Sequence, residues 1–259
     1  MLPVINLFGI IIPTYGLLVV IGIIVGLVVI INYFIKSYNI TKEDALYALV
    51  FGVIGAIIGA KLLYIITNIN VLIENKENIF NVLSTMVKGG FVFYGGLIGG
   101  IIGIYIYSKI FKISFKELLL VIIPAVPLMH AFGRLGCLAV GCCYGNHYTG
   151  VGSIVFSTSP VAPNGVPLFP VQIIESICNL IIFIILFITY KRYKGTYKSI
   201  LLYTLLYSIT RFVLEFFRGD VIRGKMLYFY TSQWISIAIM LICVLILVIN
   251  NKKIIKVEK

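Results

Sequence analysis

Charged side chains are scarce in this chain of 259 residues: Asp, Glu, Lys and Arg make up 12% of it, and 61% is hydrophobic. A soluble globular domain carries about a quarter charged residues. A surface that faces water cannot hide so large an apolar excess, so the composition predicts a protein whose outer surface faces lipid. The net charge of +12 does not indicate nucleic-acid binding, because the basic residues lie in short clusters between long apolar runs.

The chain also lacks the marks of a removable signal peptide. Residues 1–13 contain no basic side chain, and no small-residue cleavage site follows the first apolar run, so we expect that run to remain as a membrane span. No internal repeat is evident, which gives no support to an inverted-repeat transporter. Few acidic residues fall inside apolar segments, and this disfavours coupled ion transport.

Seven apolar segments are long enough to cross a bilayer, since a spanning helix needs about 20 apolar residues. The sequence therefore predicts an all-α integral membrane protein with seven transmembrane helices, folded as a single polytopic domain over 1–259. The predicted spans are 14–35, 45–68, 90–110, 118–140, 171–190, 198–217 and 231–250.

Lys and Arg are concentrated in alternate connections between the spans. These connections are 36–42, 109–116, 191–198 and 252–259. The positive-inside rule places them in the cytoplasm, which puts the N-terminus outside and the C-terminus in the cytoplasm. On the outer side, 69–89 is expected to form an arm. Residues 141–170, rich in Gly, Pro, Ser and Thr, are expected to form a small extracytoplasmic cap with short strands around 152–156.

Ionisable side chains inside spans are costly and therefore mark candidate functional sites. The first group lies in 130–145, which contains a histidine, an arginine and three cysteines. The rigid fork of donors on Arg134 suits phosphate or carboxylate, although an isolated arginine that snorkels to lipid headgroups would be ordinary. His130 is a candidate general base if it faces a cavity, and a hydrogen bond to a backbone carbonyl is the alternative.

Two further groups stand out. In 211–220, Arg211 and Glu215 are four residues apart on one helix face, which predicts either a structural ion pair or a cation, oriented by its glutamate, that grips an anionic headgroup. In 94–99, small residues spaced at four mark close helix packing, and Tyr94 is placed to donate a hydrogen bond into a cavity. The polar set is completed by Tyr15, Gln172 and Glu175.

Three cysteines follow Arg134: Cys137, Cys142 and Cys143. The spacing H-x6-C-x4-C-C matches no standard structural zinc pattern, and adjacent cysteines rarely ligate one ion, so we expect no metal site and no cofactor. A disulfide on the oxidising outer side and a thiol nucleophile activated by Arg134 both remain open.

At these residues the chain resembles the prolipoprotein diacylglyceryl transferase family, in matching order over nearly its whole length. The family signature has the form G-R-x-G-N-F-x-N-G-E-x-x-G, and residues 133–145 read GRLGCLAVGCCYG. The glycines and the arginine match. Cys137, Val140 and Cys142 replace the two asparagines and the glutamate.

Two further family elements lie in the first half of the chain. Residues 15–17 resemble the first-helix Y-G-L element. Residues 93–99 resemble F-H-G-G-L-I-G, with Tyr94 in place of the histidine.

The second half carries three more family elements. Residues 170–175 resemble H-P-S-Q-L-Y-E, with Phe169 in place of its histidine. Residues 211–218 closely match R-F-x-x-E-F-x-R, and 232–233 resemble a G-Q element.

The resemblance implies a multi-pass enzyme of the bacterial plasma membrane. Such an enzyme lies among the membrane lipids. It transfers the diacylglyceryl group of phosphatidylglycerol to the lipobox cysteine thiol of a prolipoprotein and releases glycerol phosphate. With His130 added from its place beside Arg134, the candidate catalytic residues are Arg134, Arg211, His130, Tyr94 and Glu215. The implied substrate-binding residues are Tyr15, Gly95, Gly96, Cys137, Cys142, Gly145, Gln172 and Glu175.

The resulting hypothesis is that Arg134 and Arg211 hold the lipid phosphate and stabilise the charge that grows on it. The family histidine at position 94 is a candidate base, whereas tyrosine, with an ordinary pKa of about 10, is a poor base at neutral pH. His130 or the phosphate itself is left to take the thiol proton.

Three other functions stay open. The loss of the family histidine and asparagines motivates a related lipid-group transferase with a different thiol or hydroxyl acceptor. The cluster of Cys137, Cys142 and Cys143 motivates a membrane thiol oxidoreductase. A non-enzymatic lipid-binding or transport protein is the last alternative.

Overall fold

The computed structural model describes residues 3–7, 9–75, 78–220 and 224–257. Within these ranges, seven helical segments are long and apolar enough to cross a membrane. The chain is therefore a multi-pass α-helical membrane protein, as its apolar runs predicted, and the predicted ends of the spans agree to within three residues. The spans are Thr14–Ser37, Lys42–Thr67, Phe93–Ile110, Phe115–Val140, Val171–Thr189, Lys198–Phe217 and Thr231–Ile249.

The chain forms two compact units, one of Ile30–Ile122 and one that combines Met1–Val29 with Ile123–Lys259. A single domain over 1–259 stays a prediction, as do the orientation of the termini and the sidedness of the basic connections. Lys259, part of the C-terminal basic cluster, lies outside the described residues.

The 30–122 unit is built on two long helices that pack closely. Its elements are a π-helical turn at Ile30–Phe34, a 3₁₀ turn at Ile35–Ser37, α2 (Lys42–Thr67), α3 (Ile69–Glu74), α4 (Ile79–Lys88), α5 (Phe93–Ile110) and α6 (Phe115–Ile122). A Cβ at Gly99 of α5 would collide with the carbonyl of Gly55 on α2, and Gly95 meets Gly59 in the same way. The close packing predicted from the glycine spacing is confirmed at these positions.

Polar side chains at one end of this unit fix the start of α2. The Thr41 hydroxyl accepts a hydrogen bond from the Asp44 backbone at 3.0 Å, and the Asp44 carboxylate accepts one from the Thr41 backbone, which completes a capping box. The Tyr107 hydroxyl on α5 also donates to Asp44, at 3.0 Å. The arm expected over 69–89 contains α3 and α4, and residues 76–77 within it lie outside the described residues.

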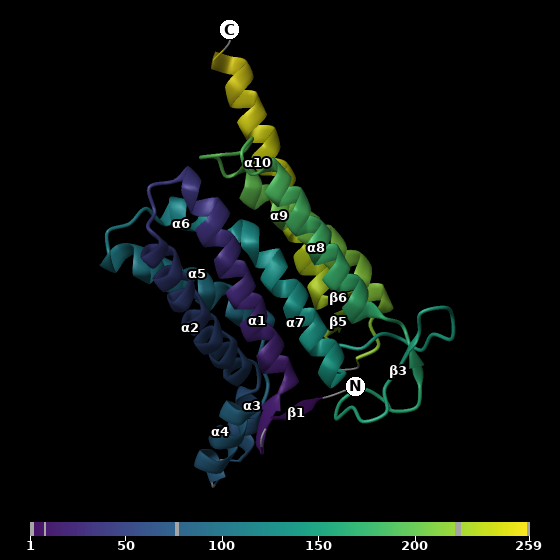
Figure 1. Ribbon diagram of the computed structural model, residues 1–259. Coiled ribbons are helices and arrows are strands. Elements are labelled where there is room, and N and C mark those ends of the chain that lie inside the picture. Colours follow the sequence, from purple (N-terminus) through teal and green to yellow (C-terminus); the bar gives the residue numbers. More distant parts are fainter. Residues whose placement is uncertain (1–2, 8, 76–77, 221–223, 258–259) are drawn as a thin grey trace. The chain divides into compact units, whose positions relative to one another are not determined.

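The other unit contains the remaining spans and the cap. Its helices are α1 (Thr14–Val29), α7 (Val126–Val140), α8 (Val171–Thr189), α9 (Lys198–Leu214) and α10 (Thr231–Val257), with 3₁₀ turns at Ile123–Ala125 and Glu215–Phe217. Its strands form antiparallel pairs: β1 (Val4–Leu7) with β2 (Ile10–Pro13), β3 (Ile154–Val155) with β4 (Pro167–Leu168), and β5 (Lys225–Met226) with β6 (Phe229–Tyr230). Helix α7 packs against α1 on one side and α8 on the other, and α9 packs against α8 and α10 (Figure 1).

The 141–170 segment is a compact cap with a small apolar core. Phe156, Ala162 and Leu168 are buried together in it, and β3 lies within the stretch where short strands were expected. Gly141 ends α7 in a left-handed conformation with φ of 82°, which glycine adopts without steric cost. The Ser159 hydroxyl donates to the Val140 carbonyl at 2.9 Å and so ties the cap to the end of α7.

Candidate active site

Arg134 is a buried cation on α7, with 7% of its surface exposed. Its Nη2 atom lies 2.7 Å from Oε2 of Glu175 on α8, and its Nη1 atom lies 3.7 Å from Sγ of Cys137. In the part of the chain that the structure describes, the Nε atom of Arg134 has no hydrogen-bond partner. A buried guanidinium donor without a partner is costly, so this atom favours an incoming anion.

Glu175 connects three helices. Its carboxylate is 2% exposed. Besides Arg134, its Oε2 atom lies 4.0 Å from Nη1 of Arg211 on α9, and its Oε1 atom lies 4.0 Å from Nε2 of His130 on α7. The carboxylate thus holds two guanidinium groups and an imidazole around one point where α7, α8 and α9 meet.

Arg211 has a second carboxylate partner. Its Nη2 atom lies 2.6 Å from Oε2 of Glu215, one helical turn later, and the Glu215 side chain is 1% exposed. Buried charges are tolerated only when they are paired. The site therefore contains two cations and two anions held by one another, which fixes the arginine positions before any ligand binds.

The three cysteines come together at the end of α7. Their sulfur atoms all lie within 4.8 Å of one another. Hydrogen bonds with Cys137 and Cys142 hold the pKa of the Cys143 thiol well below its ordinary value. For Cys142, a hydrogen bond with Cys137 acts to lower the pKa, but the hydrogen bond with Cys143 and burial outweigh it and raise the pKa to about 11.

Two predicted substrate-binding residues contact the end of α7 and the cysteines that follow it. Gln172 on α8 is 1% exposed, and its Nε2 atom donates to the Cys142 carbonyl at 3.1 Å. Tyr15 on α1 packs on Gly136 of α7, where an added Cβ would lie 3.0 Å from Cδ2 of Tyr15. In this structure both side chains position the end of α7.

Gly145 of the cap contacts the segment that follows α9, and this contact is here called the seam. An added Cβ at Gly219 would crowd the Gly145 carbonyl, so the two backbones are in close contact. Arg218, next to Gly219, pairs with Asp220 through two contacts, Nε to Oδ1 at 2.9 Å and Nη2 to Oδ2 at 2.6 Å. This double contact holds the seam beside Cys143, whose thiol interacts electrostatically with Arg218.

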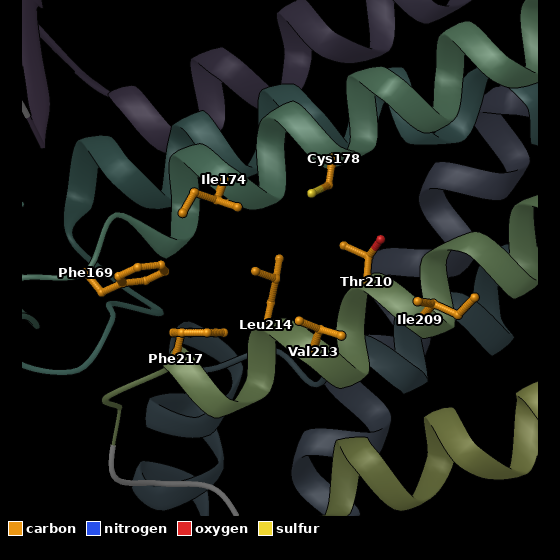
Figure 2. A pocket seen from close by; sticks show the side chains of 8 residues that line it. All are labelled: Phe169, Ile174, Cys178, Ile209, Thr210, Val213, Leu214 and Phe217. Atoms are coloured by element: carbon orange, nitrogen blue, oxygen red, sulfur yellow. The ribbon is translucent and has the colours of Figure 1, made fainter. Parts of the chain in front are cut away.

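An apolar pocket of about 410 Å³ opens between α8 and α9 (Figure 2). It is lined by Phe169, Ile174, Cys178, Ile209, Thr210, Val213, Leu214 and Phe217. The Phe169 and Phe217 rings stack at one end, with centroids 4.8 Å apart. Thr210 and Leu214 directly precede Arg211 and Glu215 in the chain, so the pocket and the ion pair use neighbouring residues of one span. Apolar space beside fixed cations suits a lipid with an anionic headgroup.

Three of the predicted residues belong to the other compact unit. Tyr94, Gly95 and Gly96 are on α5 in the 30–122 unit. Gly95 packs against Gly59 of α2, and an added Cβ at Gly96 would lie 3.4 Å from the Ala56 carbonyl. The part of these three residues in catalysis or substrate binding stays a prediction.

The described residues thus define a multi-pass membrane protein with paired buried arginines and glutamates beside an apolar pocket. Residues 3–249 match the family model described as prolipoprotein diacylglyceryl transferase. The chain belongs to the prolipoprotein diacylglyceryl transferase family.

Relatives from several bacteria carry names that agree with this membership. Phosphatidylglycerol–prolipoprotein diacylglyceryl transferase 2 of Clostridium perfringens (strain 13 / Type A) is 37% identical over 250 residues, which cover 96% of this chain and 94% of that protein. The phosphatidylglycerol–prolipoprotein diacylglyceryl transferase of Clostridium tetani is 34% identical over 247 residues, with 95% and 96% covered. The protein of that name from Clostridioides difficile is 34% identical over 215 residues, with 83% and 82% covered.

Proposed function

We propose that this chain transfers the diacylglyceryl group of phosphatidylglycerol to the lipobox cysteine of a prolipoprotein, in the bacterial plasma membrane. Family membership and the names of the relatives support the reaction class. The observation that carries the proposal is the buried Arg134, whose Nε atom has no hydrogen-bond partner among the described residues, beside Glu175 and Arg211. A lipid phosphate is the anion that such a site would meet in a membrane.

The donor lipid binds with its two ends in different surroundings. Arg134 and Arg211 contact the phosphate, since a guanidinium presents several N–H donors in a fixed plane. An acyl chain lies in the pocket between α8 and α9, whose lining side chains are almost all apolar. Glu175 and Glu215 keep both guanidiniums in place when the site is empty and between turnovers.

The reaction exchanges one bond for another. The acceptor sulfur forms a bond to the glycerol carbon as the bond from that carbon to the phosphate oxygen breaks, and the bonding electrons leave with glycerol phosphate. Negative charge grows on the departing phosphate, where the two guanidiniums stabilise it. The thiol proton goes to His130, 4.0 Å from Glu175, or to the phosphate itself.

The orientation of the protein follows from the loop charges. The N-terminus and the 141–170 cap lie outside, on the side from which the acceptor approaches. Tyr15, Gln172, Cys137, Cys142 and Gly145 shape the outer end of the site.

Transfer from labelled phosphatidylglycerol to a lipobox peptide by the purified protein in detergent tests the proposal. We expect a labelled peptide with the cysteine sequence and none when that cysteine is replaced by serine. Consumption of lipid without peptide labelling would instead favour a related transferase with another acceptor. Absence of any turnover would contradict the proposal and favour thiol redox chemistry or lipid binding alone.

A further inference from the structure

The strongest unassigned feature is the set of three sulfur atoms at the end of α7, here called the thiol cluster: Cys137, Cys142 and Cys143. All three are free thiols, and all their sulfur atoms lie within 4.8 Å of one another. Cys137 is buried, while Cys142 and Cys143 are partly exposed. Access to the cluster is therefore greater at Cys142 and Cys143 than at Cys137.

The backbone explains how two adjacent cysteines face one point. Neighbouring side chains of an extended strand point to opposite sides. Here Gly141 has φ of 82° and Cys143 has φ of 54°, a left-handed conformation that residues other than glycine seldom adopt. The chain turns back on itself, and Gln172 holds the turn through the Cys142 carbonyl at 3.1 Å. The sequence spacing of the cysteines argued against a metal site, because spacing alone does not show that the backbone turns here.

The separations suit one metal ion. Zinc–sulfur bonds are about 2.3 Å long, so sulfur atoms that share one ion lie roughly 3.8–4.0 Å apart. No two sulfur atoms in the cluster are more than 4.8 Å apart. Each pair therefore has to approach by no more than about 1 Å to reach the separation of sulfur atoms that share one ion. Thiolates are the ligands that select soft divalent ions such as Zn²⁺ over Mg²⁺ or Ca²⁺.

The charge of the site also suits such an ion. Three thiolates and one divalent ion leave a single negative charge. Arg134 faces it, with Nη1 3.7 Å from Sγ of Cys137. The same guanidinium contacts Glu175 at 2.7 Å, so one residue joins the thiol cluster to the predicted phosphate site.

From these contacts we infer that the thiol cluster binds a divalent thiophilic metal ion whose fourth position accepts and activates the acceptor thiol. This inference rests on the proposed transferase function. Zinc sites with three protein ligands keep a position for substrate, and a thiol that binds the metal is deprotonated. On binding, the acceptor thiol gives its proton to His130 or to the lipid phosphate, the proton acceptors of the proposed reaction. Its sulfur then bonds to the glycerol carbon as the carbon–oxygen bond to phosphate breaks, and the electron pair leaves with the phosphate.

Cobalt titration tests metal binding directly. The purified protein, reduced and freed of metal with a chelator, is titrated with Co²⁺, which has thiolate charge-transfer bands, and then with Zn²⁺. We expect one ion per chain, with Zn²⁺ displacing Co²⁺. Cys137→Ser, Cys142→Ser and Cys143→Ser should each weaken binding by more than about tenfold, since even losses outside the ligand set cost about 10–100-fold. Cys243→Ser, in α10 and outside the cluster, is the matched control and should bind as wild type does.

Addition of the lipobox peptide then tests thiol activation. The cysteine peptide should change the Co²⁺ charge-transfer bands, and the serine peptide should leave them unchanged. Absence of Co²⁺ binding, binding unaffected by all three substitutions, or identical spectra with both peptides would overturn the inference. Full transfer by the metal-free protein would overturn it while leaving the transferase function intact. Metal and peptide binding without any lipid transfer would instead contradict the proposed function.

Discussion

Glu175 on α8 lies 2.7 Å from Arg134 on α7, and this buried ion pair is the contact around which the candidate site is assembled. Because the same carboxylate also lies 4.0 Å from Arg211, it sets the distance between two guanidinium groups on different helices. Two cations would otherwise repel each other in a site of low dielectric constant. The carboxylate therefore acts as a spacer between the two arginines that are proposed to bind the phosphate.

Glu175→Gln is expected to reduce transfer while keeping the size of the side chain. The neutral amide no longer holds both guanidiniums, and a misplacement of about 1 Å costs roughly 100-fold in rate. The loss of one partner from a buried pair should also lower the free energy of unfolding by about 3–5 kcal/mol. Steady-state transfer kinetics and thermal unfolding in detergent measure the two effects. Glu74→Gln, an exposed change on α3, serves as the control. Wild-type kinetics in the Glu175 variant would exclude the spacer role.

Thr210→Trp is expected to fill the apolar pocket between α8 and α9. The indole takes the volume assigned to the lipid acyl chain, so KM for phosphatidylglycerol should rise about tenfold, equivalent to about 1.4 kcal/mol of binding free energy. A short-chain phosphatidylglycerol should be less affected than a long-chain one. Ile181→Trp places the same side chain on an exposed part of α8 and should leave KM unchanged. Equal KM values for the two variants would argue against the pocket as the acyl-chain site.

Two adjacent glycines of α5 give a matched test of helix packing. A Cβ at Gly99 would collide with the backbone of Gly55, whereas a Cβ at Gly100 would lie 3.4 Å from the Gly52 carbonyl, at ordinary contact distance. Gly99→Ala forces α2 and α5 apart and should cost about 1–3 kcal/mol. Gly100→Ala should be nearly neutral. Unfolding of both variants in the same detergent measures the difference, and equal stabilities would contradict the packing described here.

The spans were predictable because their length is imposed by the bilayer. The runs at 171–190 and 198–217 end within one residue of Val171–Thr189 and Lys198–Phe217, since a lipid-facing helix needs about 20 apolar residues whatever it packs against. The glycines of α5 likewise indicated close packing. Their partners, Gly55 and Gly59, depended on which helix lies alongside, and sequence spacing carries no such information.

The site was predictable only in its parts. Arg134, Arg211 and Glu215 stood out because charges are rare in spans, and the pairing of Arg211 with Glu215 followed from their helical spacing. The bridging position of Glu175 did not, because it depends on how α7, α8 and α9 meet. That the three thiols lie close together was not predicted, because it depends on a left-handed conformation at Cys143. Residues other than glycine seldom adopt this conformation, so the local sequence does not indicate it.

The release of labelled glycerol phosphate in a single turnover tests the role of the two arginines most directly. Arg134→Lys and Arg211→Lys keep the charge but remove the planar set of donors, and Arg192→Lys, in the exposed connection after α8, is the matched control. We predict that each of the first two variants slows release by about 10²–10³-fold, as loss of a preorganised donor to a developing anion does, while the control remains at the wild-type rate. Wild-type release by both Arg134→Lys and Arg211→Lys would contradict the account, because the departing phosphate would then be stabilised elsewhere.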